Sequence, residues 1–412
     1  MNPFPCIYAQ SLLGLLIFMV STCSAPTHEQ TGEEKPLPGT YAADLEFLKQ
    51  YRQVIELHNE NSFVLLSTED QGRVMTSSAN GRSGYSFGWI NYNLFSSPPG
   101  EKLHMHAYGG EDRFWLGPEG GQFSVYFAPG TPFEFAHWFV PDAIDTEPFT
   151  LLSNSESEAV FVREIHLNNH SGNNFDLDVR RTIRILSPNI SSQKLGISLP
   201  KDVNMVGFES ENQITNSGEN AWTKESGALS VWILTMLKPS PETTIAIPLN
   251  QGSRKINDAY FGKIPADRLL IGDHTLLMKA DGKYRSKIGI PPGRNSPYAG
   301  SYDAQNHVLT IVSYTIHPEI SDYVNSMWER QESPFGGDVV NAYNDGPLED
   351  GSQMGPFYEL ETSSPAAFLA PGESMIHVHS TFHFSGEPEA LNGIAEKVLG
   401  ISIESITTAL TK

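Results

Sequence analysis

Residues 357–384 read FYELETSSPAAFLAPGESMIHVHSTFHF, and this stretch carries the clearest signal for the fold. From Ile376 to Phe384, apolar and polar side chains largely alternate, which is the two-residue period of a β-strand. FYELET has the same period. The residues between the two runs are small or are Pro and Gly, which favour turns. We therefore predict two strands that are joined near APGE and lie next to each other in one sheet.

The same signal recurs along most of the chain. Short apolar or alternating runs are broken by Gly, Pro, Asn and Asp; examples are SFVLLS (62–67), AVFVREIHL (159–167), FDLDVRRTIRIL (175–186), ALSVWILTML (228–237), TTIAIPL (243–249) and HVLTIVSYTI (307–316). Many short strands separated by turns are typical of an antiparallel all-β protein. No fixed-period repeat is present, which argues against propellers and solenoids. We predict one large β-sandwich domain over residues 41–412, with two broad sheets.

Short helices are expected at the two ends of this domain. DLEFLKQYRQVIEL (44–57) places Leu45, Leu48, Arg52 and Ile55 on roughly one face, and Asp44 can cap its start. EALNGIAEKVLG (389–400) reads as a terminal helix.

The N-terminus resembles an export signal. SLLGLLIFMVSTC (Ser11–Cys23) is a short apolar run that ends in small residues and a cysteine, and it is too short to span a bilayer comfortably. The ending resembles a bacterial lipobox, so we expect residues 1–23 to be a signal peptide, Cys23 to be lipidated and residues 24–40 to form a flexible tether. The protein would then be exported and membrane-anchored, in the periplasm or at the cell surface. The alternative is an ordinary cleaved secretory signal.

Composition excludes several classes of function. The formal net charge of −21 argues against nucleic acid and against an anionic membrane surface as partners. Cys6 and Cys23 are the only cysteines, and both lie in the predicted leader, so the domain has no disulfide and no thiol chemistry. There is no P-loop, dinucleotide fingerprint, G-x-S-x-G elbow or HEXXH motif.

Several acids and histidines share strand faces. Side chains at i and i+2 point the same way, so His104 and His106 form one pair, Glu359 and Glu361 a second, and His377 and His379 a third. We expect a face with such groups to be solvated or to line a polar cavity, because the apolar core would not accept it. Acid and imidazole pairs suit general acid–base chemistry near neutral pH. They also suit Ca²⁺ or Zn²⁺, but the spacing matches no specific metal motif, so no cofactor is required.

Two further stretches combine glycines, polar groups and flat aromatic side chains. They are LHMHAYGGEDRFWLGPEGGQ (103–122) and MWERQESPFGGDVVNAYNDGP (327–347). Sugars need this combination, since their C–H faces stack on aromatic rings and their hydroxyls need planar polar partners. The alternative is a structural loop in which Asn and Asp satisfy local backbone groups. The candidate sugar-binding residues are His104, Glu111, Arg113, Trp115, Glu119, Trp328, Asn341, Asn344, Asp345, Glu359 and His379.

With these residues identified, the chain resembles the galactose-mutarotase-like superfamily, which includes aldose 1-epimerases. HMHAYGGEDRFW is similar to the superfamily's H-x-L-H-G-G stretch, and LETSSPAAFLAPGESMIHVHSTFHF is similar to its C-terminal L-E-T-Q segment and final strand. The resemblance implies a large β-supersandwich, a carbohydrate ligand and Glu361 as the base on the anomeric hydroxyl. Ser217 stands where a second catalytic histidine is found, and Ser363 replaces the glutamine. The chain also resembles a group of secreted lipoproteins in this superfamily.

These observations favour an enzyme that acts at the anomeric centre of a sugar, either epimerase-like or glycoside-hydrolase-like. Glu361 would be the base, with His106 or His377 as the acid or as a ligand of a sugar hydroxyl. Arg113 and Glu119 would orient the sugar, and Trp115 or Trp328 would stack on it. Two other hypotheses remain open: a non-catalytic glycan-binding protein, and a structural lipoprotein without a small ligand.

Overall fold

The computed structural model describes residues 35–98 and 103–410. Pro36–Lys412 forms one compact unit. The predicted signal peptide, Cys23 and most of the predicted tether lie outside the described residues. Within the described part of the chain, no helix is both long enough and apolar enough to cross a membrane.

One sheet has eight strands, and every pair in it is antiparallel. In spatial order its strands are β1 (Val54–Asn59), β2 (Ser62–Ser67), β3 (Arg73–Ser78), β4 (Gly110–Gly117), β9 (Ser230–Met236), β17 (Tyr358–Ser363), β16 (Val340–Asn344) and β13 (Ser286–Ile290).

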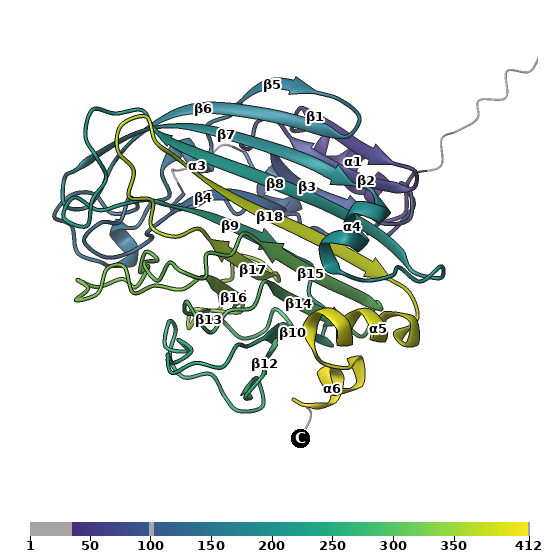
Figure 1. Cartoon of the computed structure of the whole chain (residues 1–412). Coiled ribbons are helices and arrows are strands. Elements are labelled where there is room, and N and C mark those ends of the chain that lie inside the picture. The colour runs from purple at the N-terminus through teal and green to yellow at the C-terminus, as the bar shows by residue number, and fades with distance from the viewer. Residues whose placement is uncertain (1–34, 99–102, 411–412) are drawn as a thin grey trace, which may run out of the picture. The chain divides into compact units, whose positions relative to one another are not determined.

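The second sheet has ten strands and is also antiparallel (Figure 1). Its spatial order is β11 (Leu269–Ile271), β12 (Thr275–Lys279), β10 (Thr243–Pro248), β14 (Tyr298–Asp303), β15 (Val308–Tyr314), β18 (Ser374–Ser385), β8 (Asn204–Asn216), β7 (Asn174–Leu186), β6 (Glu158–Asn168) and β5 (Thr150–Asn154). The predicted antiparallel β-sandwich is therefore confirmed.

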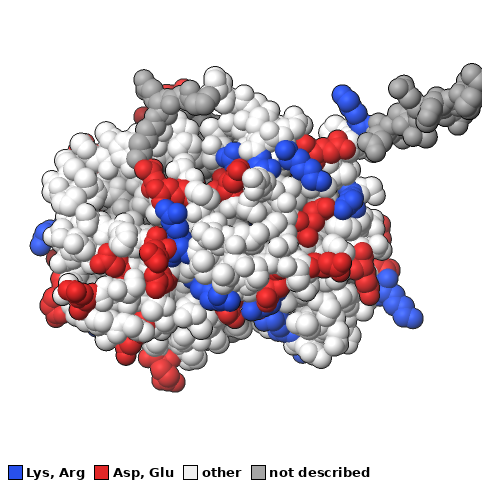
Figure 2. All heavy atoms as spheres, turned by 90° about the horizontal axis from the view of Figure 1, so that it is seen from above, with Lys and Arg blue, Asp and Glu red and all other residues white. Residues whose placement is uncertain are grey.

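Helices are few and short. They are α1 (Tyr41–Leu48), α2 (Tyr92–Ser96), α3 (Asp142–Asp145), α4 (Pro188–Leu195), α5 (Pro388–Leu399) and α6 (Ile403–Thr408), with a 3₁₀ turn η1 at Phe135–His137. The predicted C-terminal helix is confirmed as α5. It and α6 pack on the outer face of the ten-stranded sheet, where Leu391 and Ile394 join the apolar cluster that includes Phe382. On the face drawn in Figure 2, basic and acidic side chains are interspersed.

The predicted N-terminal helix over 44–57 is too long. Helix α1 ends at Leu48, and its start is capped by Thr40 rather than by Asp44. Val54 and Ile55 instead begin β1 and pair with β2. Their β-branched side chains fit a strand better than a helix, and pairing with β2 decides the outcome.

The predicted hairpin between β17 and β18 is wrong. β17 lies in the eight-stranded sheet between β9 and β16, whereas β18 lies in the ten-stranded sheet between β15 and β8. Residues 364–373 therefore cross from one sheet to the other. The alternation identifies each of the two strands, but it does not specify which other strand each one pairs with in a sheet.

The interior between the sheets contains an apolar core, to which Val64 and Phe114 belong, and also a buried polar layer. His377 and His379 are 0% exposed, and both hydrogen-bond to the Thr362 hydroxyl at 2.9 Å. This overturns the expectation that their face is solvated or lines a cavity. Hydrogen-bonded polar side chains can occupy an interior because their partners replace water.

Candidate functional site

The outer face of the eight-stranded sheet carries a cluster of charged and aromatic side chains. Strand alternation and register place them together: Asn341 is paired with Glu361, Tyr343 with both Glu359 and Lys287, and Trp115 with Trp232. The side chains of paired residues lie on the same face of an antiparallel sheet. The predicted Glu359/Glu361 pair is thus confirmed as sharing a face.

Glu361 is the centre of this cluster. Its side chain is 0% exposed, and its Oε2 accepts hydrogen bonds from Trp232 Nε1 at 3.0 Å and from Lys287 Nζ at 2.9 Å. Its Oε1 is buried and has no hydrogen-bond partner. A buried carboxylate oxygen without a partner is costly, and such atoms are found at functional sites.

Lys287 supplies the positive charge beside Glu361. Its Nζ lies 4.9 Å from the ring centre of Trp232 and 5.5 Å from that of Tyr260. Burial lowers the pKa of Lys287, but the nearby carboxylates of Glu361 and Glu119 outweigh burial and raise it. Lys287 therefore keeps its positive charge in the site.

A second ion pair lies beside the first. Arg113 donates to Glu359 Oε1 at 2.6 Å, and its guanidinium carbon lies 4.9 Å from the ring centre of Trp115. Burial raises the pKa of Glu359, and the Arg113 guanidinium opposes this rise by favouring the charged carboxylate. Glu359 and Glu361 thus have the same side chain but different partners.

Glu119 joins the cluster from the loop after β4. Its backbone N–H donates to Ser326 Oγ at 3.1 Å, and Trp328 donates to its side chain. Burial raises the pKa of Glu119 to about 7, against the lowering effect of Lys287. A carboxyl group with this pKa exchanges its proton near neutral pH, as a general acid must.

The loop that carries Glu119 is held against the loop that carries Trp328. Gln122 and Gln331 exchange hydrogen bonds at 3.0 Å in both directions. A Cβ on Gly120 would lie 2.4 Å from the carbonyl oxygen of Met327, so only glycine permits this approach. The two loop-rich stretches found in the sequence are therefore brought together.

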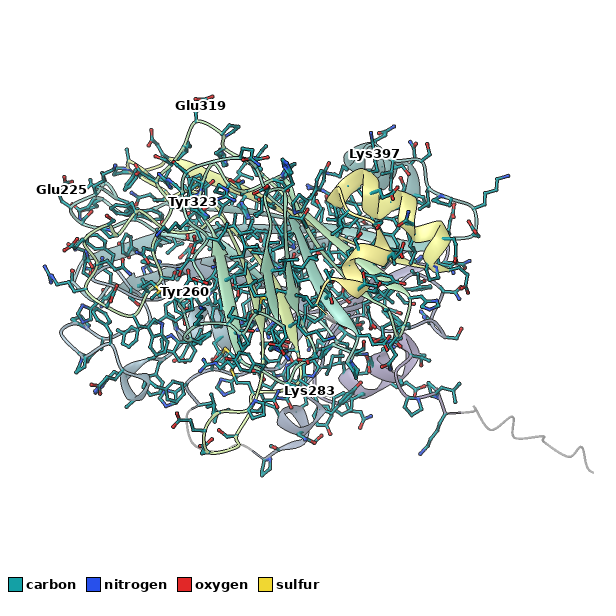
Figure 3. All side chains as sticks on the ribbon, turned by 90° about the horizontal axis from the view of Figure 1, so that it is seen from below. Glu225, Tyr260, Lys283, Glu319, Tyr323 and Lys397 are labelled. Carbon is teal, nitrogen blue, oxygen red and sulfur yellow. The ribbon has the colours of Figure 1, made fainter. Side chains whose placement is uncertain are left out.

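A small polar pocket opens beside these groups. Tyr260 donates to Asp338 Oδ2 at 2.7 Å, and Asn341 donates to the Tyr260 hydroxyl at 3.3 Å. Burial raises the pKa of Asp338 to about 6. Figure 3 shows Tyr260 inside the outline of the molecule, whereas Glu225 and Glu319 stand at its rim. The pocket is lined by Gly117, Ser230, Trp232, Tyr260, Lys287, Val324, Ser326, Asp338, Asn341 and Ser363.

The model of a protein family of unknown function, DUF6786, matches residues 39–410. The chain belongs to this family. A comparison with curated proteins found no match in sequence.

Solved structures of mutarotase-like proteins are similar to this DUF6786 chain. A candidate aldose 1-epimerase of Escherichia coli K12 is 15% identical, with a TM-score of 0.47 over 81% of this chain and 99% of that one. A galactose mutarotase-like protein of Lactobacillus casei ATCC 334 is 11% identical, with a TM-score of 0.44 over 81% of this chain and 100% of that one. A galactose mutarotase related enzyme of Lactobacillus acidophilus is 9% identical, with a TM-score of 0.43 over 81% and 97%.

Within this DUF6786 fold, several predicted site residues do lie together. Arg113, Trp115, Glu119, Asn341, Glu359 and Glu361 all belong to the cluster or its rim, and Trp328 reaches it through Glu119. Their roles in binding or catalysis stay predictions.

The predicted acid His377 lies in the interior between the two sheets, whereas Glu361 lies on the outer face of the eight-stranded sheet. Thr362, next to Glu361 in β17, points to the opposite face and holds His377 there. His379 is bound to the same hydroxyl. Glu111 also faces the interior, where its Oε2 accepts hydrogen bonds from Ser77 and is paired with His383 Nε2 at 2.8 Å. None of these side chains can reach a ligand on the outer face.

The two histidines of LHMHAY do not form the predicted strand pair, because this segment is irregular in the structure. His104 Nδ1 is bound to the Trp138 carbonyl at 2.6 Å, and His106 Nδ1 to Asp145 Oδ2 at 2.8 Å. In the described part of the chain, the hydrogen-bond donors to Glu361 are Trp232 and Lys287, and neither histidine is among them.

Asn344 and Asp345 have structural roles instead of facing a ligand. Asn344 donates to the Tyr284 carbonyl and accepts from the Gly282 N–H. Asp345 accepts from Tyr343 and from the Gly355 N–H. This is the local hydrogen bonding that was the alternative for residues 327–347.

Sequence reasoning missed Lys287, Trp232 and Tyr260. A lysine in the five-residue strand SKIGI and a tryptophan inside VWILTM look like ordinary strand residues. One signal was available: a cation in a short apolar strand needs a buried partner. For metals, the described residues contain no group of three or more His, Cys, Asp or Glu side chains placed to hold an ion.

Proposed function

We propose that this protein binds a sugar on the outer face of the eight-stranded sheet and acts at its anomeric centre, as an epimerase-like or glycoside-hydrolase-like enzyme. The observation that carries the proposal is Glu361 Oε1, a buried carboxylate oxygen without a partner beside Trp232 and Lys287. A substrate hydroxyl would supply the missing hydrogen-bond donor.

The chemistry follows from two carboxyl groups in different environments. Glu361 Oε1 takes the proton of the anomeric hydroxyl, while protonated Glu119 gives its proton to the ring oxygen. The bond between the anomeric carbon and the ring oxygen then breaks, which leaves an open-chain aldehyde that can close on either face. The pKa of about 7 at Glu119 supports its role as the acid.

The pocket must widen to admit a sugar. Only about 10 Å³ of it is open to the centre of a water-sized molecule, which is roughly one water. Tyr260 and Lys287 are half-buried and line it. Side-chain movement at these two positions is therefore part of the proposal.

The second candidate is a glycan-binding protein without turnover. It is favoured by the ion pair between Lys287 and Glu361, because the positive charge of Lys287 makes the Glu361 carboxylate a weaker base. Both candidates need the aromatic walls, but only the enzyme needs Glu361 Oε1 as a base.

The test is thermal unfolding of residues 36–412 with a panel of mono- and oligosaccharides, followed by turnover assays on the sugars that stabilise. A sugar at 100 times its Kd should stabilise by about 2.7 kcal/mol. Glu361→Gln should keep this shift and lose roughly 10²–10⁴-fold in turnover. The matched control is Glu225→Gln, which changes an exposed carboxylate at the rim of the molecule (Figure 3).

Three outcomes separate the candidates. Loss of turnover with retained binding in Glu361→Gln supports the enzyme. A stabilising sugar that the wild-type protein never converts supports the binding protein. If no sugar stabilises the protein, both carbohydrate proposals fail.

We also propose that the protein works outside the cytoplasm, anchored through a lipid on Cys23. The support is the apolar run Ser11–Cys23 with its lipobox-like ending. Cys23→Ser should abolish labelling by a fatty-acid analogue and move the protein from the membrane fraction to the soluble one. Labelling that persists in the variant would reject the anchor.

A further inference from the structure

A buried serine hydroxyl lines the pocket without a hydrogen-bond partner. Ser230, at the start of β9, is 0% exposed, and its Oγ has no partner within residues 35–98 and 103–410. Gly117 is paired with Ser230 and also lines the pocket. A Cβ on Gly117 would lie only 2.7 Å from Ser230 Oγ, so the glycine leaves space beside this hydroxyl. A buried hydroxyl without a partner is costly, and a ligand that hydrogen-bonds to it removes that cost.

A carboxyl group lines the same pocket further along the sheet. Asp338 precedes β16, and its carboxyl lies over β13, because a Cβ on Gly289 would lie 1.9 Å from Asp338 Oδ2. The strands between are in the order β9-β17-β16-β13, so the strands of Ser230 and Gly289 are roughly 14 Å apart. One ligand hydroxyl therefore cannot bind both Ser230 and Asp338.

Hydrogen bonds around Asp338 decide what it offers to a ligand. Tyr260 donates to Asp338 Oδ2 at 2.7 Å, and Asn341 donates to the Tyr260 oxygen at 3.3 Å. Because the Tyr260 proton points to Asp338, both groups present acceptors to the pocket. Burial raises the pKa of Asp338 to about 6, which still leaves the carboxyl charged at pH 7.5. The ligand must therefore supply a donor here, as a hydroxyl does.

The charge and the size of the pocket favour a neutral hydroxyl-bearing ligand. Among the lining residues, Lys287 and Asp338 are charged, one of each sign. A carboxylate on the ligand would be repelled by Asp338, and an ammonium group by Lys287. The open space is roughly that of one water, which is also the size of one hydroxyl group.

We propose that Ser230 and Asp338 bind two different hydroxyl groups of one neutral sugar ring, and thereby determine which sugars the pocket accepts. The inference rests on the proposed function and makes it more specific: the ligand is an uncharged sugar in which both of these hydroxyls are free. A site built to hydrogen-bond a hydroxyl rejects the analogue that lacks it, because the polar groups of the site then stay buried without a partner. The ring enters when the pocket widens at Tyr260 and Lys287.

The experiment measures by calorimetry the Kd of glucose, galactose and mannose, and of the 2-, 3-, 4- and 6-deoxy forms of each. The variants are Ser230→Ala, Asp338→Asn and the control Ser191→Ala. Ser191 matches Ser230 closely, because it is 1% exposed and its Oγ also lacks a partner among the described residues. It lies on α4, which packs on β8 of the other sheet. No change enlarges a side chain, so the fold should persist, and circular dichroism checks this.

For the wild type, we expect removal of the sugar hydroxyl that meets Asp338 to weaken binding roughly 10–100-fold, and removal of the one that meets Ser230 to weaken it roughly 3–10-fold. The second loss should disappear in Ser230→Ala, because the partner of that hydroxyl is already gone. The first loss should shrink in Asp338→Asn, at a different position of the ring. Ser191→Ala should behave as wild type.

Two results would overturn the inference. One is a wild type that binds every deoxy form as tightly as the parent sugar, which would leave a water as the partner of Ser230. The other is a pair of variants in which both losses persist unchanged.

Failure of the proposed function looks different. Turnover that survives in Glu361→Gln rejects the proposed chemistry, while the pattern of losses among the deoxy sugars still supports the two hydroxyl contacts. Absence of binding by every sugar rejects both. Stronger binding of glucuronate or glucosamine than of glucose rejects the neutral ligand.

Discussion

At the scale of single residues, three glutamates show how neighbours decide the role of one chemical group. Glu361 is bound by Trp232 and Lys287 at one oxygen and is free at the other. Glu359 is paired with Arg113. Glu119 is half-buried, and burial raises its pKa to about 7. On the basis of these differences, we assign Glu361 as the base, Glu359 as a structural ion-pair partner and Glu119 as the acid.

The role of Glu119 predicts a pH dependence. An acid must carry its proton, and a group with a pKa of about 7 loses it as pH rises. The kcat/KM should therefore fall above about pH 7 in the wild type. Glu119→Gln should lower the rate by about 10²-fold and remove this alkaline limb.

The measurement is kcat/KM from pH 5 to 9 for the wild type, Glu119→Gln and the exposed-site control Glu225→Gln. The control should keep the limb. An alkaline limb that is unchanged in Glu119→Gln would exclude Glu119 as the acid and would leave Glu359, whose pKa is also raised by burial, as the next group to test.

At the scale of elements, alternation tells which side chains share a face, but packing decides what that face meets. In β17 the odd-numbered Glu359 and Glu361 point outward, while Thr362 points inward to His377. In β18 the histidine face points into the sandwich and Ile376 is 44% exposed. Apolar–polar alternation predicted the reverse arrangement for β18. The histidines are accepted inside because Thr362 and Thr381 hydrogen-bond to them.

This buried layer predicts a loss of stability in acid. Burial and the neighbouring His379 lower the pKa of His377 to about 3, and burial lowers that of His379 to about 4. In the unfolded chain both rings protonate near pH 6.5. Below that pH the unfolded state binds more protons, so the stability present at pH 7.5 is lost as pH falls towards 4. Between pH 7.5 and 5 the free energy of unfolding should drop by up to about 4 kcal/mol from these two groups.

Urea unfolding at a series of pH values checks this. His377→Gln keeps a hydrogen-bonding amide but cannot titrate. Between pH 7.5 and 5 its free energy of unfolding should therefore fall about half as steeply as that of the wild type. The control is His166→Gln, since the His166 side chain is 77% exposed. Equal slopes for wild type and His377→Gln would mean that the buried histidines are not the source of acid sensitivity.

At the scale of the whole molecule, charged side chains join the two sheets. Arg181 in β7 donates to Asp112 Oδ1 in β4 at 2.5 Å, and both side chains are 0% exposed. Arg181 also donates to Asn212 Oδ1 at 2.6 Å. This link crosses the sandwich between strands that are far apart in sequence, so the relative position of the sheets depends on it.

Removing this link should be costly. Arg181→Met leaves Asp112 buried without its cation, which should lower the free energy of unfolding by about 3–5 kcal/mol. Arg184→Met is the matched control on the same strand, because Arg184 is 35% exposed and its pair with Glu158 lies at the surface, so at most about 1 kcal/mol should be lost. Urea unfolding at pH 7.5 measures both. Similar losses in the two variants would show that the buried pair contributes no more than a surface pair.

Part of the fold and of the candidate site followed from the sequence alone. Two-residue alternation and turn residues predicted the strands, the all-β class and the shared face of Glu359 and Glu361, because these depend on local geometry. The tertiary structure alone decided that β17 and β18 belong to different sheets, that His377 and Glu111 are buried, and that Lys287 comes from a distant strand to meet Glu361. Those outcomes depend on which strands pair and which faces meet. Many pairings bury similar apolar area, and only packing of the complete chain selects one of them.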